Sequence, residues 1–187
     1  MPQPSTLSQF KATLKDGGAR PNLFEVTITP PNGSGVTLGN DFSILCKASS
    51  LPASNIGSID VPYRGRTFKV AGDRTYDPWS VTIINDEDFK IRKAMETWMQ
   101  YIGQYEDGSG RMNPNDYMAS AIVRQLKRGA STANASSGAG LADGTGVYKF
   151  HDIFPTNISA IDLSYDSTDT IEEFTVEFQI QYWTPFT

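Results

Sequence analysis

The sequence is poor in the residues on which most catalytic and metal sites depend. Among its 187 residues there is one cysteine, Cys46, and one histidine, His151. A lone cysteine excludes an internal disulfide and a cysteine-rich metal site, and a lone histidine excludes a metal site with several histidine ligands. The chain therefore offers few candidates for nucleophilic or metal-assisted chemistry.

Positive charge and long apolar runs are also scarce. The chain has 16 Lys and Arg against 21 Asp and Glu, a net charge of −5, whereas a nucleic-acid groove needs clustered basic residues. No apolar run approaches the roughly 20 residues of a membrane-spanning helix, and residues 1–10 lack the basic and apolar regions of a signal peptide. These absences predict a soluble protein from a reducing compartment, without a membrane partner.

Short segments with the pattern of β-strands are abundant. In most of them apolar and polar residues alternate, which is typical of half-buried strands. The predicted strands are residues 24–29, 42–50, 59–63, 68–70, 79–84, 160–166 and 172–183. The last two flank the turn-forming sequence DSTDT and predict a long C-terminal hairpin, with one apolar face and one acidic-polar face.

One segment has clear helical periodicity. Its apolar residues recur at the spacing of one helix face and are candidates for helix–sheet packing: Ile91, Met95, Trp98 and Ile102. Asn85 or Asp86 can cap its start, the acidic residues 86–88 suit the positive end of the helix dipole, and Gly103 marks its end. With many strands, one main helix and no βαβ rhythm, the predicted fold is mainly β, an antiparallel sandwich or barrel with one external α-helix.

The length suits one domain with a sizeable core, and we expect residues 1–187 to form it. Residues 1–18 are polar and predict an extended N-terminal arm. Residues 129–146 are rich in Gly, Ala and Ser, contain almost nothing to bury, and predict a flexible loop rather than a link between domains.

Few residue patterns suggest catalysis. Asp152 follows His151, but neighbours in a strand face opposite ways, so a catalytic His–Asp pair is not expected. The glycine-rich segment lacks the Gly-Lys-Ser/Thr sequence of a phosphate-binding loop. Carboxylates at 86–88 and 172–173 leave open a glycosidase, which needs two of them at a controlled spacing, although the helix dipole already explains the first group. We expect no enzyme, no cofactor and no bound metal.

Residues 69–84, KVAGDRTYDPWSVTII, raise a separate question, because two turn-like sequences interrupt a strand-like segment. Gly72 tolerates backbone conformations that other residues resist, and Asp77 with its following proline fixes the exit toward the next strand. The charged residues Asp73 and Arg74 can form a structural ion pair or contact a neighbouring chain. The pattern by itself leaves open a catalytic loop or an ordered connector.

Five segments, in order, resemble the tail tube protein of contractile-tailed bacteriophages of the T-even type. They are ARPNLFEV (19–26), CKASSLPA (46–53), VAGDRTYDPWSVTIINDE (70–87), SAIVRQ (120–125) and FPTNIS (154–159). The resemblance covers nearly the whole chain. It implies a barrel-like β subunit with an external helix, in hexameric rings that stack into a hollow tube inside a contractile sheath. It also implies that residues 120–125 form a strand, where local propensity is ambiguous.

The resemblance also implies roles for particular residues. Tube subunits of a virion contact one another, the sheath, the baseplate and the tail terminator, and DNA leaves the capsid through the channel without specific binding. The candidates for an ordered connector or an inter-subunit contact are then Gly72, Asp73, Arg74 and Asp77. The candidate channel-lining residues are Glu173, Thr175, Glu177 and Gln179. Carboxylates and amides do not hold a polyanion, whereas Lys and Arg bind its phosphates.

Residues 174–182 also predict ring formation, because a long, regular strand without proline aggregates at a sheet edge unless a neighbouring subunit covers it. The turn at 30–40 and the segment 129–146 look longer than the family pattern. Alternatives with the same fold are a baseplate tube-initiator subunit and the tube of a type VI secretion or phage-like injection device. A carbohydrate-active β-sandwich enzyme and a small ligand-binding barrel are more distant alternatives.

Overall fold

The computed structural model describes residues 7–14, 18–126 and 144–186. The helices in these ranges are α1 (Leu7–Thr13), α2 (Gly39–Leu45), α3 (Lys90–Ile102) and α4 (Pro114–Tyr117). The strands are β1 (Phe24–Thr29), β2 (Cys46–Ser49), β3 (Ser54–Tyr63), β4 (Arg66–Tyr76), β5 (Trp79–Ile84), β6 (Ala119–Leu126), β7 (Gly144–Ile158), β8 (Glu173–Gln179) and β9 (Tyr182–Phe186).

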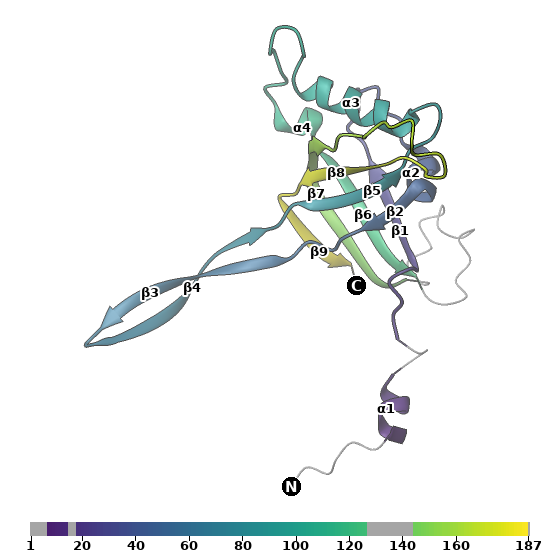
Figure 1. The fold of residues 1–187 in the computed structure, drawn as a ribbon. Coiled ribbons are helices and arrows are strands. Elements are labelled where there is room, and N and C mark those ends of the chain that lie inside the picture. Colours follow the sequence, from purple (N-terminus) through teal and green to yellow (C-terminus); the bar gives the residue numbers. More distant parts are fainter. Residues whose placement is uncertain (1–6, 15–17, 127–143, 187) are drawn as a thin grey trace.

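Most strands belong to one antiparallel sheet. Its order is β1-β6-β7-β8-β5-β2, and β9 pairs with β7 beside this path. Strands β3 and β4 pair with each other as a separate two-stranded sheet and project as a long hairpin (Figure 1). The predicted antiparallel, mainly β architecture is confirmed, and β6 confirms the strand expected at residues 120–125.

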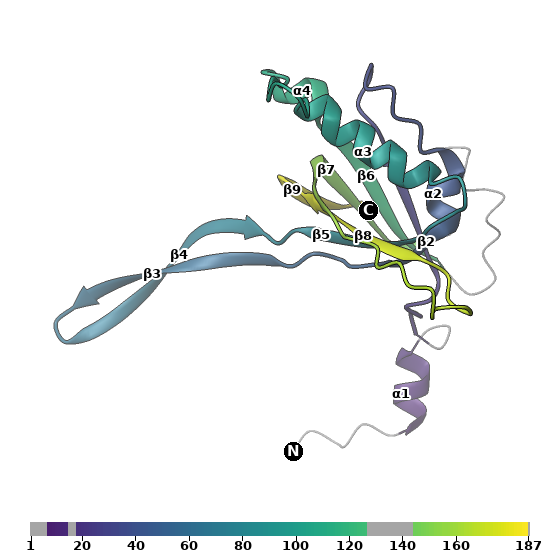
Figure 2. The same ribbon diagram turned by 45° about the horizontal axis from the view of Figure 1, so that its top comes forward.

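Helix α3 crosses one face of the sheet (Figure 2). Its Ile91, Met95 and Trp98 are buried, and Ile102 is partly buried against the same core. The Trp98 indole donates a hydrogen bond to the carbonyl of Tyr117 over 2.9 Å, which satisfies the one polar atom of this buried ring. The apolar stripe of α3 thus belongs to the core, and the opposite side of the helix faces solvent.

The start of α3 differs from the prediction. The helix begins at Lys90, several residues after the predicted cap. Asp86 still serves the helix start, because its Oδ1 accepts the backbone N–H of Lys90 over 3.0 Å. Phe89 has a φ of 54°, which lies outside the right-handed helical region and therefore delays the first turn. The helix ends before Gly103, as predicted.

Aromatic rings from three strands and α3 form the centre of the core. The Trp79 ring of β5 lies 4.9 Å from Phe150 of β7 and 5.1 Å from Phe178 of β8, measured between ring centroids. Trp98 of α3 lies 6.0 Å from Phe178. Because alternate residues of a strand face opposite ways, burial of these rings turns the polar residues of β5 and β8 to the other face of the sheet.

The predicted C-terminal hairpin is wrong. Residues 159–172 form a loop, and the strand predicted at 172–183 is divided into β8 and β9. Strand β8 lies between β5 and β7, so it is not the sheet edge from which ring formation was predicted. Alternation shows which residues share a face, but it does not show which distant strand supplies the hydrogen bonds.

The strand predicted at residues 42–50 is wrong in its first half, which belongs to α2, and right in its second half, which contains β2. Phe42 is the buried residue of α2, and Leu38, which immediately precedes the helix, is buried as well. A short apolar run does not distinguish a buried helix from a buried strand. Cys46 begins β2 inside the core, where burial raises the pKa of its thiol to about 12.

Two predicted segments fall partly outside the described residues. Of the arm at residues 1–18, the structure gives α1, whose residues are all exposed, together with residues 14 and 18. Of the loop at residues 129–146, it gives only 144–146, which belong to β7. The rest of the predicted flexible loop lies outside the described part of the chain.

Replacement of Met95 by alanine tests the contribution of the α3 stripe to stability. The Met95 side chain is 0% exposed, so Met95→Ala leaves a cavity under α3. We expect the free energy of unfolding to fall by about 2–5 kcal/mol. Met112 is 100% exposed and provides the control, since Met112→Ala is expected to change this free energy by less than about 0.5 kcal/mol. Urea titrations followed by tryptophan fluorescence measure both, and equal effects would contradict the packing described for α3.

Candidate functional site

The β3–β4 hairpin presents a continuous apolar face. Val61 pairs with Phe68 and Ile59 pairs with Val70, so these four side chains share one side of the ribbon. Together with Tyr63 they form what we call the apolar hairpin face. Its residues are between 42% and 66% exposed. An exposed apolar surface of this kind marks a site of contact with another molecule.

The turn predicted within residues 71–74 is wrong, because these residues lie inside β4. Gly72 and Asp73 together oppose Gly57 of β3, which is a β-bulge, and a bulge bends and twists a strand without ending it. A Cβ on Gly72 would lie 3.2 Å from the carbonyl oxygen of Gly57, so glycine permits this close approach of the two strands. Within the described residues no ion pair joins Asp73 to Arg74, and both side chains are exposed.

Both ends of the hairpin have defined geometry. At its tip the chain reverses at Arg64 and Gly65, whose φ angles are 46° and 80°, as the RGR sequence predicts. At its base the side-chain amide of Asn55 donates to the Asp77 carboxylate over 3.0 Å, and the Asp77 N–H donates to the carbonyl of Ala53 over 3.1 Å. Asp77 thus joins the two strands where they enter the main sheet.

The second candidate surface is the side of β5 and β8 that faces away from α3. We call it the polar sheet face, and it consists of Ser80, Thr82, Glu173, Thr175, Glu177 and Gln179. It therefore contains all four predicted channel-lining residues. Glu173 and Glu177 are exposed, and the hydroxyls of Thr82 and Thr175 lie 3.2 Å apart between the two strands.

A basic residue lies beside the polar sheet face, although the C-terminal sequence contains none. The Nζ atom of Lys47, in β2, lies 2.5 Å from Oε1 of Glu173. Both side chains are partly exposed, so their attraction contributes no more than about 1 kcal/mol. The pair mainly changes the local charge, because Lys47 neutralises Glu173. Among the described residues, no ion pair neutralises Glu177, the other carboxylate of this face.

The groups considered for catalysis do not converge. His151 stacks on the Tyr182 ring with 4.5 Å between centroids, and its Nε2 lies 3.2 Å from the hydroxyl of Thr184. Glu172 accepts a hydrogen bond from the side chain of Asn85, and the carboxylates 86–88 surround the start of α3. In the described ranges, no group of three or more His, Cys, Asp or Glu could hold a metal ion, and no helix is long and apolar enough to cross a membrane.

Acid should weaken the pairing of β7 with β9. Desolvation, followed by the positive charge of Lys149, lowers the pKa of His151, while Asp152 acts in the opposite direction. The unfolded chain therefore takes up a proton at a higher pH than the folded chain. The contribution of neutral His151 to the free energy of unfolding should be fully present above about pH 6.5. It should be lost as the pH decreases toward the lower pKa of the folded state.

Urea titrations at about pH 8 and about pH 5.5 measure this loss, in a range where most carboxylates stay ionised. His151→Gln should remove most of the difference between the two conditions. A loss of the same size in the variant would mean that a different group is responsible.

The prominent surfaces of the fold are thus a projecting apolar hairpin and a polar sheet face, which is typical of a structural protein that assembles with other chains. The sequence model of the phage tail tube protein family matches residues 19–185, and the chain belongs to this family.

Relatives in that family match along nearly their whole length. The tail tube protein gp19 of Enterobacteria phage T4 is 37% identical over 166 residues, which cover 88% of this chain and 90% of the relative. The tail tube protein of Serratia phage KSP90 is 25% identical over 178 residues, 94% of each chain. The resemblance stated from the five sequence segments is therefore confirmed.

Solved structures share the fold at low sequence identity. A chain of the anti-feeding prophage baseplate has a TM-score of 0.62 and 10% identity, and the match covers 90% of this chain and 95% of that one. A chain of the PVC sheath–tube complex, from an extracellular contractile injection system, has a TM-score of 0.57 and 12% identity over 98% and 99% of the two chains. At these identities the likeness establishes the fold alone.

Proposed function

We propose that this chain is the major subunit of the inner tail tube of a contractile phage tail. Hexameric rings of it stack into a hollow tube, and the channel conducts DNA during ejection. The observation that carries this proposal is the 37% identity to the T4 tail tube protein gp19 over 88% of the chain. Because 90% of that relative is covered as well, the two proteins correspond as whole subunits.

A tube of this kind has partners along its whole length. Chains of the same fold occur in solved structures of a baseplate, of a sheath–tube complex and of a tube-terminating cap. These complexes support a sheath, a baseplate and a terminator as the partners of the present tube, within the virion.

The second candidate is a tube subunit of a baseplate or of a phage-like injection device. The TM-scores of 0.62 and 0.57 to such proteins favour it, but these proteins are only 10% and 12% identical to the chain. The 37% and 36% identities to tail tube proteins of phages T4 and T6 favour the main tail tube.

The polar sheet face is our candidate for the channel wall. A wall of Lys and Arg would bind DNA phosphates through release of counterions and would slow passage. This face instead presents hydroxyls, an amide and two carboxylates, and its neighbouring Lys47 is paired with Glu173. The opposite side of the sheet is buried under α3 and so is not available to a channel.

Reversal of the two carboxylates tests this assignment. In assembled tubes, the double substitution Glu173→Lys and Glu177→Lys should create a basic wall beside Lys47. We expect the tubes to hold short duplex DNA that is protected from nuclease, with an affinity that falls steeply as salt increases.

The control is Glu87→Lys with Glu106→Lys, which makes the same change in charge at exposed positions on either side of α3. DNA on the outer wall should stay sensitive to nuclease. Equal protection in both double variants, or a density map with Glu173 and Glu177 on the outside of the tube, would overturn the assignment of the wall.

Negative-stain electron microscopy of the purified chain tests the proposed function itself. Six domains of this size around an axis should give rings about 100 Å across or less, and stacked rings should give tubes. A carbohydrate-active enzyme or a ligand-binding barrel gives no such assemblies. Monodisperse monomers at every protein concentration would contradict the proposal.

A further inference from the structure

Strands β5 and β8, which carry the polar sheet face, and the neighbouring strand β2 contain a single basic residue, Lys47. The residues on either side of Lys47 pair with consecutive residues of β5, so Lys47 is the extra residue of a β-bulge. A bulge redirects the side chain at the extra position. The Lys47 side chain is 53% exposed, and its amine reaches Glu173, so the amine lies at the polar sheet face.

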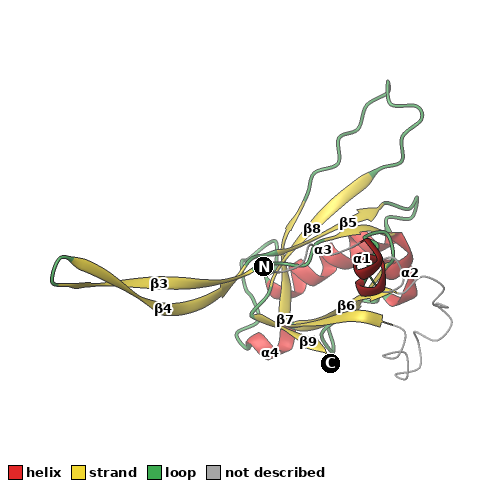
Figure 3. Ribbon diagram, turned by 90° about the horizontal axis from the view of Figure 1, so that it is seen from below, coloured by secondary structure: helices red, strands yellow, loops and turns green. Residues whose placement is uncertain are grey.

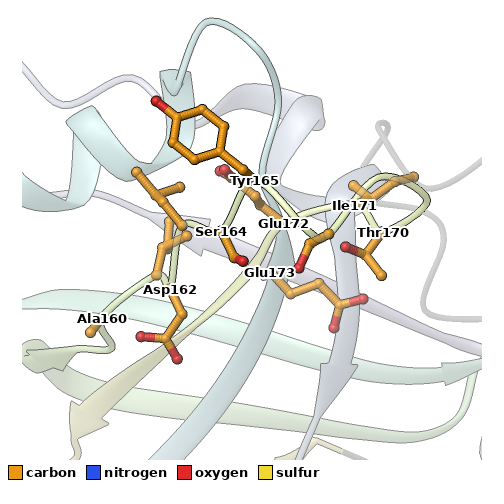
Figure 4. A pocket seen from close by; sticks show the side chains of 11 residues that line it. Ala160, Asp162, Ser164, Tyr165, Thr170, Ile171, Glu172 and Glu173 are labelled. Atoms are coloured by element: carbon orange, nitrogen blue, oxygen red, sulfur yellow. The ribbon is translucent and has the colours of Figure 1, made fainter.

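The ion pair of Lys47 with Glu173 joins two strands that are not neighbours. The strand order β8-β5-β2 places β5 between them, and the Nζ and Oε1 atoms are nevertheless 2.5 Å apart. Glu173 also borders the open hollow, about 630 Å³ in volume, that the preceding loop forms (Figure 4). The adjacent carboxylate of Glu172 accepts a hydrogen bond from Asn85 instead. In the described ranges, Glu173 is therefore the one carboxylate that forms an ion pair with Lys47.

The position of Glu173 decides how much of the Lys47 charge a phosphate meets. A free lysine ammonium binds phosphate and releases counterions. An ammonium that lies beside a carboxylate has almost no net charge at the distance from which a phosphate approaches, and salt screens what remains within about 10 Å. In a ring of identical subunits the same pair recurs once in every subunit. The loss of Glu173 would therefore expose one amine per subunit at every level of the tube.

We propose that Lys47 is a latent phosphate-binding residue of the channel, and that Glu173 is the counter-ion that keeps it from DNA in transit. The two carboxylates of the polar sheet face then have different roles. Glu177 adds negative charge to the wall, whereas Glu173 removes the effect of a positive charge. The weak hold of the wall on DNA depends on this one pairing more than on the total charge of the face. The inference rests on the proposed tube function and identifies the pair of residues that controls the affinity of its channel for DNA.

Replacement of the carboxylate by an amide of the same shape tests the pairing. In assembled tubes, Glu173→Gln should increase the amount of short duplex DNA that is protected from nuclease by about tenfold at low salt, because it frees Lys47. Retention should fall more steeply with salt than in the original protein, and the slope of log retention against log salt should change by about one unit for each added phosphate contact. Negative-stain images identify the tubes, and thermal melting checks that the variant is folded.

Two matched variants separate the pairing from net charge. Glu177→Gln makes the same change in charge at an exposed position of the same strand and face, but it frees no lysine, so it should raise retention by less than about threefold. Lys47→Met with Glu173→Gln removes the freed amine and keeps an apolar stem, so retention should return to within about twofold of the original protein. If a variant does not assemble alone, tubes assembled from mixtures with the original protein give the same comparison.

The outcomes separate this inference from the proposed function. If the original protein forms no tubes, the tube function itself is wrong. If tubes form but Glu173→Lys with Glu177→Lys holds no protected DNA, the polar sheet face is not the channel wall. If that double variant holds DNA but Glu173→Gln and Glu177→Gln raise retention equally, Glu173 contributes only its charge. If Lys47→Met does not reverse the effect of Glu173→Gln, Lys47 is not the phosphate contact. Either of these last two results would overturn the inference.

Discussion

The arrangement of both candidate surfaces depends on the burial of Trp79 between Phe150 and Phe178, with Trp98 of α3 beside them. Each such ring removes on the order of 150–250 Å² from water, and at about 25 cal/mol per Å² this is roughly 4–6 kcal/mol per ring before entropic costs. A partly exposed ion pair such as Lys47 with Glu173 contributes no more than about 1 kcal/mol. Apolar burial therefore decides which way β5 and β8 face, and their polar face follows from the two-residue period of a strand.

The β3–β4 hairpin follows the same alternation but has no core to cover it. Its bulge at Gly72 and its base at Asp77 give it a defined shape, while its apolar side chains stay exposed. In a monomer this is a cost, because exposed apolar surface and strand edges promote association. A protein of the phage tail tube family, however, works by associating with other subunits. Under the proposed function, the burial of these exposed side chains between subunits would favour assembly.

The contact surface and the channel wall that we propose need opposite chemistry, and they lie on different parts of the fold. A docking surface needs apolar area and paired charges, whereas a wall along which DNA slides should offer phosphates nothing to bind. The basic residues of the hairpin lie on a ribbon that projects beyond the main sheet (Figure 3). Lys47 is the exception, and its pairing with Glu173 reduces its attraction for phosphate.

Much of the fold could be predicted where local pattern and burial agree. The strand at residues 79–84 and the stripe of α3 were evident because their alternation and periodicity match the surfaces that are buried. The errors fall where a pattern has more than one structural solution. Residues 71–74 look like a turn but form a bulge, and residues 160–166 alternate like a strand but lie in a loop.

The candidate surfaces could likewise be predicted only in part from the sequence. The alternation of Ile59, Val61 and Tyr63 was visible in the sequence, but their exposure was not, because exposure depends on whether another element covers them. Lys47 is separated from Glu173 by 126 positions, and only the order β8-β5-β2 brings them together.

The sequence by itself therefore determined the class of fold, the polar character of β8, the helix stripe and the family. The tertiary structure decided which strands are neighbours, that β8 is internal rather than an edge, and that the hairpin projects without a cover. The physical reason is that side-chain alternation is a local property of the chain, whereas strand pairing and burial are set by contacts between residues far apart in sequence.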